Sequence, residues 1–276
     1  MIEPRDVVYQ RQGDREFLVR IYQPDGPGPF PTVVDVHGGA WHIGDRRQNA
    51  VMHVAMAAHG ILVAALDFRQ SQDAPYPASI LDINLGVRWL KANAHHYNGT
   101  DRVGGLGSSS GGHQILLTAL RPLDPRYTAL EGPPAAASLA YVVACWPVSN
   151  PLERYRRARE LNLDGVEAYT AYWPDEAAMA EGSPHLIVER GDAQALPPLL
   201  VLQGTADALV PPEMQTRFVE TYRAAGGQAD LVLFDGMPHT FVQRQPDHPE
   251  SRRAIDTMIQ FVHHQSPLAA TAAGSR

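Results

Sequence analysis

The chain alternates short apolar runs with longer stretches of helical periodicity, and this alternation limits the folds open to it. PTVVDVHGG (31–39) and GILVAALDF (60–68) are apolar runs that end in turn residues, as buried strands do. PASILDINLGVRWLKANAHHY (77–97) then places apolar side chains at helical spacing, with a proline near its start. Strands that alternate with helices predict an α/β fold with a mostly parallel sheet and helices on both faces.

Further strands and helices extend this pattern to the end of the chain. REFLVRIYQ (15–23) alternates apolar and polar residues, which predicts a half-exposed strand at an edge of the sheet. The other expected strands are 102–110, 138–147, 197–207 and 229–236, and the other expected helices are 110–120, 211–227 and 250–264.

One segment, residues 148–195, is far longer than a single crossover helix needs. It contains two stretches of helical character, and we expect a small helical cap inserted over the open end of the sheet. A surface excursion without function is the alternative. The prediction is therefore a single domain over residues 1–265 with this cap insertion, followed by a disordered tail at 266–276.

Composition excludes several classes of protein. The formal net charge of −7 argues against a nucleic-acid partner, because phosphates require a basic surface. No run reaches the roughly eighteen apolar residues of a membrane span, and the N-terminus lacks the basic-then-apolar pattern of a signal peptide. We therefore expect no membrane association and a cytoplasmic location. Cys145 is the only cysteine, so no intrachain disulfide can form, and its apolar neighbours predict a buried side chain.

The stretch GLGSSSGGH (105–113) raises the question of whether one of three consecutive serines is a nucleophile. A sharp turn from strand into helix can present a side chain at the carboxyl edge of a sheet, and it requires small residues two positions before and after the turning residue. Among the three serines, Ser109 has glycine at both positions, Gly107 and Gly111. We predict that Ser109 is the nucleophile. A Gly/Ser-rich linker is the alternative.

A serine hydroxyl needs a base, and the base needs a group that orients it. His239 follows the last expected strand, and Asp207 follows the strand before it. Because the carboxyl ends of parallel strands meet at one edge of a sheet, we expect both residues beside Ser109. The sequence thus predicts a catalytic triad, with activity that falls in acid as His239 becomes protonated.

The loop DVHGGAWHIGD (35–45) can supply the donors that stabilise a developing oxyanion. Its glycines let the backbone approach a substrate closely. We predict that the donors are the backbone N–H groups of Gly39, Ala40 and Ser110, and that His37 braces the loop. No cluster of His, Cys or carboxylate residues has the spacing of a metal site, so we expect no metal.

These motifs together resemble the hormone-sensitive-lipase-like branch of the α/β-hydrolases, near which feruloyl-esterase-like and arylformamidase-like enzymes lie. The resemblance rests on HGGAW, FRQSQDAPYPASILD, GSSSG, GTADALVP and GMPHTF and runs from about residue 15 to residue 262. It implies an α/β-hydrolase fold with eight strands, a triad in the chain order Ser109, Asp207, His239, and no cofactor.

Three details depart from the common pattern of that branch. Ser110 stands where alanine is frequent after the nucleophile, the loop reads Gly-Gly-Ala instead of three glycines, and Phe68 stands where tyrosine is usual. These changes bear on the choice of substrate more than on the class of reaction.

The functional prediction is a serine hydrolase that cleaves small-molecule carboxylic esters of short or aromatic acyl groups through an acyl-enzyme intermediate. Aromatic residues near the expected site or in the cap suggest an apolar or aromatic acyl pocket, with plain core packing as the alternative. These residues are Trp41, Trp146, Tyr155, Tyr169, Tyr172 and Trp173.

Two other functions stay open at this point. An amide or N-formyl hydrolase would use the same triad, and a ligand-binding protein on a hydrolase scaffold would have lost catalysis, usually together with a triad residue. The sequence is compatible with a homo-oligomer and leaves the oligomeric state open.

Overall fold

The computed structural model describes residues 2–163 and 165–267. In this part of the chain the strands form one eight-stranded sheet in the order β1-β2-β4-β3-β5-β6-β7-β8. Neighbouring strands from β4 to β8 are parallel, whereas β2 pairs antiparallel with both β1 and β4. The strands are β1 (Arg5–Gln12), β2 (Arg15–Tyr22), β3 (Phe30–Val36), β4 (Leu62–Leu66), β5 (Gly99–Ser108), β6 (Val142–Cys145), β7 (Leu199–Gly204) and β8 (Ala229–Phe234).

The N-terminal strand β1 is absent from the sequence-based prediction, and it changes the place of β2. The two strands form a hairpin that pairs Arg5 with Ile21 at one end and Gln12 with Arg15 at the other. The prediction that residues 15–23 lie at an edge of the sheet is therefore wrong, because β1 covers that edge. Arg46 ties β1 to the rest of the sheet, since it donates to Asp6 at 2.9 Å and to Asp67 at 2.7 Å.

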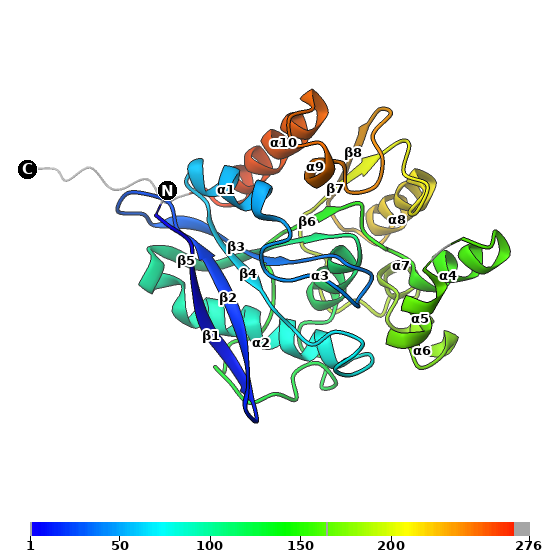
Figure 1. Cartoon of the computed structure of the whole chain (residues 1–276), viewed down its shortest axis with the longest axis horizontal. Helices are drawn as coiled ribbons and strands as arrows, with labels where there is room; N and C mark the ends of the chain where they lie inside the picture. Colours follow the sequence, from blue (N-terminus) through cyan, green and yellow to red (C-terminus); the bar gives the residue numbers. More distant parts are fainter. Residues whose placement is uncertain (1, 164, 268–276) are drawn as a thin grey trace, which may run out of the picture.

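Helices cover both faces of the sheet (Figure 1). Side chains of α1, α9 and α10 pack on one face, and those of α2, α3 and α8 pack on the other. The helices of this framework are α1 (Ala50–Ala58), α2 (Ala78–Asn93) continued by the 3-10 helix η1 (Ala94–Tyr97), α3 (Ser110–Leu120), α8 (Pro212–Ala224), α9 (Phe241–Arg244) and α10 (Pro249–Gln265).

Burial on both faces explains why the central strands are apolar throughout. In β4, Val63 belongs to the core beneath α1 and α10, whereas its neighbours Leu62 and Ala64 belong to the core beneath α2 and α3. All residues of β3 and β4 are buried. A strand in this position cannot alternate apolar and polar residues, because neither of its faces meets water.

The long segment between β6 and β7 carries α4 (Pro151–Glu160), α5 (Val166–Tyr172), α6 (Glu176–Glu181) and α7 (Pro184–Glu189). Figure 1 shows α4, α5 and α6 standing together at one end of the molecule. The division into a domain with a cap stays a prediction. Of the predicted tail, Ser266 is buried and donates to the Tyr141 hydroxyl at 3.1 Å, and residues 268–276 lie outside the described residues.

Two leucines test how much the buried helix α3 contributes to stability. Leu117 of α3 is fully buried, whereas Leu123, just beyond the helix, is 61% exposed. We expect Leu117→Ala to lower the free energy of unfolding by about 2–5 kcal/mol, because it removes buried methyl groups and leaves a cavity. Leu123→Ala should change it by no more than about 0.5 kcal/mol. Urea unfolding of both variants measures the difference, and equal losses would contradict the packing described here.

Candidate active site

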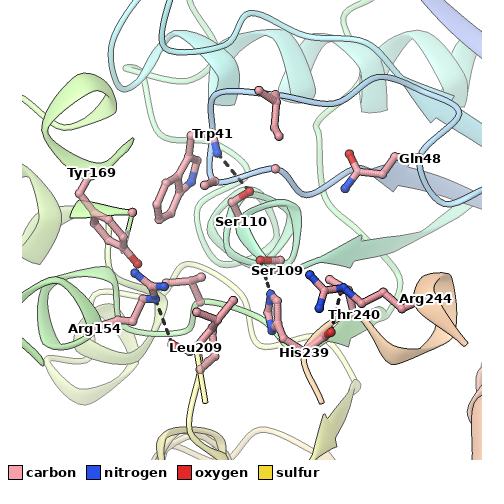
Figure 2. Close-up of a pocket in the computed structure, with 16 residues that line it drawn as sticks. Trp41, Gln48, Ser109, Ser110, Arg154, Tyr169, Leu209, His239, Thr240 and Arg244 are labelled. Atoms are coloured by element: carbon pink, nitrogen blue, oxygen red, sulfur yellow. Dashed lines mark hydrogen bonds between the residues drawn. The ribbon is translucent and has the colours of Figure 1, made fainter. Parts of the chain in front are cut away.

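Ser109 stands at the sharp turn between β5 and α3. Its backbone has φ 55° and ψ −119°, a conformation that costs a non-glycine residue about 1–3 kcal/mol. Neighbouring segments hold it there, since its N–H donates to the Cys145 carbonyl at 2.9 Å and its carbonyl accepts from the His113 N–H at 3.1 Å. The turn directs the Ser109 hydroxyl into a pocket (Figure 2).

The glycines on either side of Ser109 are sterically required. A Cβ on Gly107 would lie 2.5 Å from the Gly111 carbonyl oxygen, and a Cβ on Gly111 would lie 2.0 Å from the Val36 carbonyl oxygen. The start of helix α3 therefore lies in close contact with both β5 and β3. This contact explains why glycine is needed two residues before and two residues after Ser109, which is the pattern that distinguishes Ser109 from its neighbours.

The structure brings Ser109, His239 and Asp207 together from three different strand ends. The Nε2 atom of His239 lies 2.9 Å from the Ser109 Oγ, and its Nδ1 lies 2.7 Å from an Asp207 carboxylate oxygen. With the Nδ1 proton donated to Asp207, Nε2 is free to accept the Ser109 proton. His239 follows β8 and Asp207 follows β7, as the sequence pattern predicts.

The Asp207 carboxylate is fully buried and held by the loop that carries it. One oxygen accepts from the backbone N–H groups of Leu209 at 3.0 Å and Val210 at 2.9 Å. The other accepts from the Gln203 side chain at 3.0 Å as well as from His239. These donors stabilise the carboxylate as an anion and fix its orientation toward the imidazole.

The loop after β3 places amide groups beside Ser109. Gly39 has φ 108° and Ala40 has φ 53°, so the chain turns through the left-handed region at both residues. A Cβ on Gly39 would lie 1.8 Å from the Ile43 carbonyl oxygen, and only glycine fits there. Within the described chain, the backbone N–H groups of Gly39, Ala40 and Ser110 have no hydrogen-bond acceptor. They are available to a ligand.

Two contacts of Trp41 hold this loop against α3. Its backbone N–H donates to the Ser110 hydroxyl at 3.2 Å, and its indole N–H donates to Nδ1 of His113 at 3.1 Å. The other nitrogen of His113 donates to the Gly182 carbonyl at 2.9 Å, which links the loop to the segment between α6 and α7. Burial lowers the pKa of His113 to about 4, so the ring stays neutral and can accept from Trp41.

His37 packs inside the same loop. Its ring stacks on Phe68 with the ring centres 4.3 Å apart, and its Nδ1 lies 2.7 Å from the Gly38 carbonyl oxygen. Burial lowers its pKa. This environment fits the predicted bracing role. The Phe68 that departs from the family pattern supplies the surface on which His37 stacks.

A pocket of about 460 Å³ opens in front of Ser109 and His239. Of the six aromatic residues that the sequence suggests for an acyl pocket, Trp41 and Tyr169 line it. Trp173 instead packs against Trp41, and Trp146 packs against Phe241 on the opposite face of the sheet. The other lining residues are Gly39, Ala40, Ile43, Gln48, Ser109, Ser110, Val148, Arg154, Gly165, Leu209, Val210, His239, Thr240 and Arg244.

The sequence-based prediction misses the two arginines of this lining, Arg154 and Arg244. A signal for Arg154 exists, because the buried residues of α4 are Pro151, Arg154, Tyr155 and Ala158. This is the i, i+3, i+4, i+7 spacing of a buried helix face, and Arg154 is the charged member of that face. Arg244 lies on a helix of four residues, which is too short for a periodic pattern.

A buried polar network lies next to the turn at Ser109. The Asn49 carboxamide accepts from Ser108 at 3.2 Å and from Gln243 at 2.8 Å, and donates to Asp35 at 3.1 Å. Asp35 also lies 2.9 Å from Nε2 of His53. Ser108 is therefore bound within the core, whereas Ser109 faces the pocket.

Across residues 2–163 and 165–267, no three His, Cys, Asp or Glu side chains cluster in a way that could hold a metal ion. None of the helices in these same ranges has the length and hydrophobicity needed to cross a membrane.

Comparison with known proteins gives a family and several relatives. The sequence model of the BD-FAE family matches residues 19–222. The probable isoprenylcysteine alpha-carbonyl methylesterase ICMEL1 of Oryza sativa is 26% identical over 95% of this chain and 63% of its own length. The probable carboxylic ester hydrolase LipM of Mycobacterium tuberculosis is 30% identical over 96% of this chain and 61% of its own. The chain thus spans less than two thirds of these two curated relatives.

Among solved structures, Thermogutta terrifontis esterase 2 phosphorylated by paraoxon superimposes with a TM-score of 0.75. The match covers 98% of this chain and 97% of that one, at 23% sequence identity. The fold is therefore the α/β-hydrolase fold, as the resemblance in sequence implies.

Acid is expected to destabilise the protein through His113. Its pKa is lowered from the ordinary 6.5 to about 4, so the unfolded chain binds this proton first as the pH falls. The free energy of unfolding should decrease between about pH 6.5 and about pH 4, by on the order of 3 kcal/mol for this residue. In His113→Gln the decrease over this pH range should be smaller by that amount.

The matched control is His264→Gln, which removes an exposed histidine of α10. It should keep the pH dependence of the parent protein, as measured by urea unfolding at several pH values. If His113→Gln and the parent protein had the same pH dependence, His113 would not be neutral in the folded state.

Proposed function

Since the chain belongs to the BD-FAE family, we propose that it is a serine hydrolase that cleaves carboxylic esters of short or aromatic acyl groups. The observation that carries this proposal is the continuous contact from the Ser109 hydroxyl through His239 to the buried carboxylate of Asp207. The pocket beside Ser109 is large enough for a small ester and combines apolar walls with free amide donors.

In the proposed reaction, the Ser109 oxygen attacks the ester carbonyl while Nε2 of His239 accepts its proton. Asp207 keeps the imidazole oriented and stabilises its charged form. The new C–O bond leaves negative charge on the former carbonyl oxygen. The N–H groups of Gly39, Ala40 and Ser110 would donate to this oxyanion, and each such donor contributes about 2.7–4 kcal/mol in enzymes of this type.

The first half of the reaction ends when His239 gives its proton to the leaving alcohol and the C–O bond to that alcohol breaks, which leaves an acyl group on Ser109. In the second half, water attacks the acyl carbonyl, with His239 again as the base, and the acid is released. Each residue acts twice, so the loss of any one should impair both halves.

The names of the relatives favour esters over amides. The rice relative is a probable methylesterase, LipM is a probable carboxylic ester hydrolase, and the structural relative is an esterase that paraoxon phosphorylates. A ligand-binding role would leave the orientation of His239 by Asp207 without a purpose. The cytoplasmic location and a homo-oligomer stay predictions.

The first test is hydrolysis of p-nitrophenyl acetate and p-nitrophenyl butyrate. We expect Ser109→Ala to lower kcat by about three orders of magnitude or more, because no other group can form the acyl-enzyme. Ser108→Ala is the matched control, since Ser108 is a buried neighbour that bonds to Asn49. It should keep kcat within about tenfold. A Ser109→Ala variant as active as the parent protein would overturn the proposal.

Covalent labelling provides an independent test. Paraoxon should transfer one diethylphosphoryl group to Ser109, with p-nitrophenol as the leaving group, and abolish hydrolysis in proportion to labelling. Peptide mass spectrometry locates the group. Labelling of Ser108 or Ser110 instead, or full activity after labelling, would contradict the assignment of the nucleophile.

A further inference from the structure

Arg154 of α4 is a buried cation at the pocket wall, and no acidic residue in the described part of the chain pairs with it. Its residue exposure is 9%, and its Nε donates to the Leu209 carbonyl at 3.1 Å. Two acidic residues of the neighbouring helices pair elsewhere, Glu153 with Arg217 and Glu176 with Arg156. Among the described residues, no carboxylate forms an ion pair with Arg154. A buried guanidinium without a counter-ion is costly, unless a ligand supplies the charge.

The Tyr169 hydroxyl lies beside this guanidinium. Figure 2 shows both side chains directed to the same corner of the pocket, and the Arg154 Cζ is 5.1 Å from the centre of the Tyr169 ring. Tyr169 is 2% exposed, and its hydroxyl interacts with the Arg154 guanidinium but has no acceptor for its own proton in the part of the chain that the structure describes. Burial raises its pKa to about 12, so the hydroxyl keeps its proton and can donate it.

A second arginine adds positive charge at the mouth. The side chain of Arg244 extends from α9 toward Ser109 and His239 (Figure 2). It is exposed, and no described carboxylate pairs with it. None of the described lining residues is Asp or Glu, although the whole chain has a net charge of −7. The pocket is therefore locally positive within an acidic protein.

We propose that the pocket takes esters that carry a carboxylate, which the terminal nitrogens of Arg154 and the hydroxyl of Tyr169 bind. Planar guanidinium groups bind carboxylates through two parallel hydrogen bonds, and a tyrosine hydroxyl beside them adds a third donor. Arg244 attracts the anion from solvent, where salt screens its effect. This inference rests on the proposed function, because it assigns the substrate class of the same site.

Arg154 also has a structural contact, and the test must separate the two roles. Its bond to Leu209 steadies the loop that carries Asp207. Loss of that bond would slow the hydrolysis of every ester to the same extent. Loss of a carboxylate-binding group would slow charged esters more than neutral ones.

The experiment compares kcat/KM for two pairs of esters near neutral pH. Mono-p-nitrophenyl glutarate and p-nitrophenyl valerate differ in a carboxylate on the acyl side, and 4-acetoxybenzoate and p-tolyl acetate differ in one on the alcohol side. The parent protein should prefer the charged member of at least one pair. In Arg154→Gln that preference should fall roughly tenfold to a hundredfold, and in Tyr169→Phe by a smaller factor.

The matched control is Arg157→Gln, which removes an exposed arginine from the same helix. It should leave the preference unchanged. The pair that responds to Arg154→Gln identifies the side of the ester that carries the carboxylate. The inference is overturned if the parent protein prefers neither charged ester, or if Arg154→Gln slows charged and neutral esters equally.

A binding measurement tests the carboxylate site independently of whether the protein hydrolyses esters. Calorimetry measures the affinity of Ser109→Ala for both members of two pairs, monomethyl glutarate with methyl valerate and 4-acetoxybenzoate with p-tolyl acetate, with and without Arg154→Gln. Tighter binding of the charged ester that disappears with Arg154 supports the carboxylate site, even if the parent protein hydrolyses no ester and the proposed function fails. Equal affinity of the charged and neutral ester within both pairs overturns the carboxylate site, even if hydrolysis is rapid.

Discussion

The close contact between the start of α3 and the end of β3 is the constraint on which the rest of the site depends. Gly111 lies so near the carbonyls of Val36 and His37 that no side chain fits between them. This contact forces the chain to turn sharply at Ser109, in a backbone conformation that a non-glycine residue adopts only under constraint. It also brings the loop that follows β3 next to the first amide of α3. Ser109 and the free amide groups of the loop are thus positioned by a single packing requirement.

The loop after β3 and the segment between β6 and β7 are held to this turn by hydrogen bonds that run through aromatic residues. Trp41 bonds to both Ser110 and His113, and His113 bonds onward to Gly182. The same segment is held a second time by Tyr76, whose N–H donates to the Tyr172 carbonyl at 2.8 Å and whose hydroxyl donates to Glu181 at 2.6 Å. The pocket walls are therefore fixed before a ligand enters. Preorganised donors need no reorganisation as charge develops on a substrate.

The acidic and basic side chains of the site differ in the groups that surround them. The buried carboxylate of Asp207 is surrounded by donors and faces His239. The cations of the pocket wall face the cavity, where Arg154 has one backbone acceptor and, within the described residues, no carboxylate partner. Electrostatic interactions are stronger in such a partly enclosed space than at an open surface. The wall can therefore discriminate between substrates in a way that the net charge of the protein does not reveal.

Local sequence patterns predicted most of the central strands and helices, the mostly parallel sheet, and the meeting of Ser109, Asp207 and His239 at one edge of that sheet. These follow from local rules, namely helical and strand periodicity, the glycines two residues from Ser109, and the meeting of parallel strand ends at one edge. Only the tertiary structure shows the link from Trp41 to His113 and the contact of Arg154 with Leu209 at the pocket. Each of these contacts joins residues far apart in the chain. Local patterns contain no information on such pairings, because packing of the whole chain selects them.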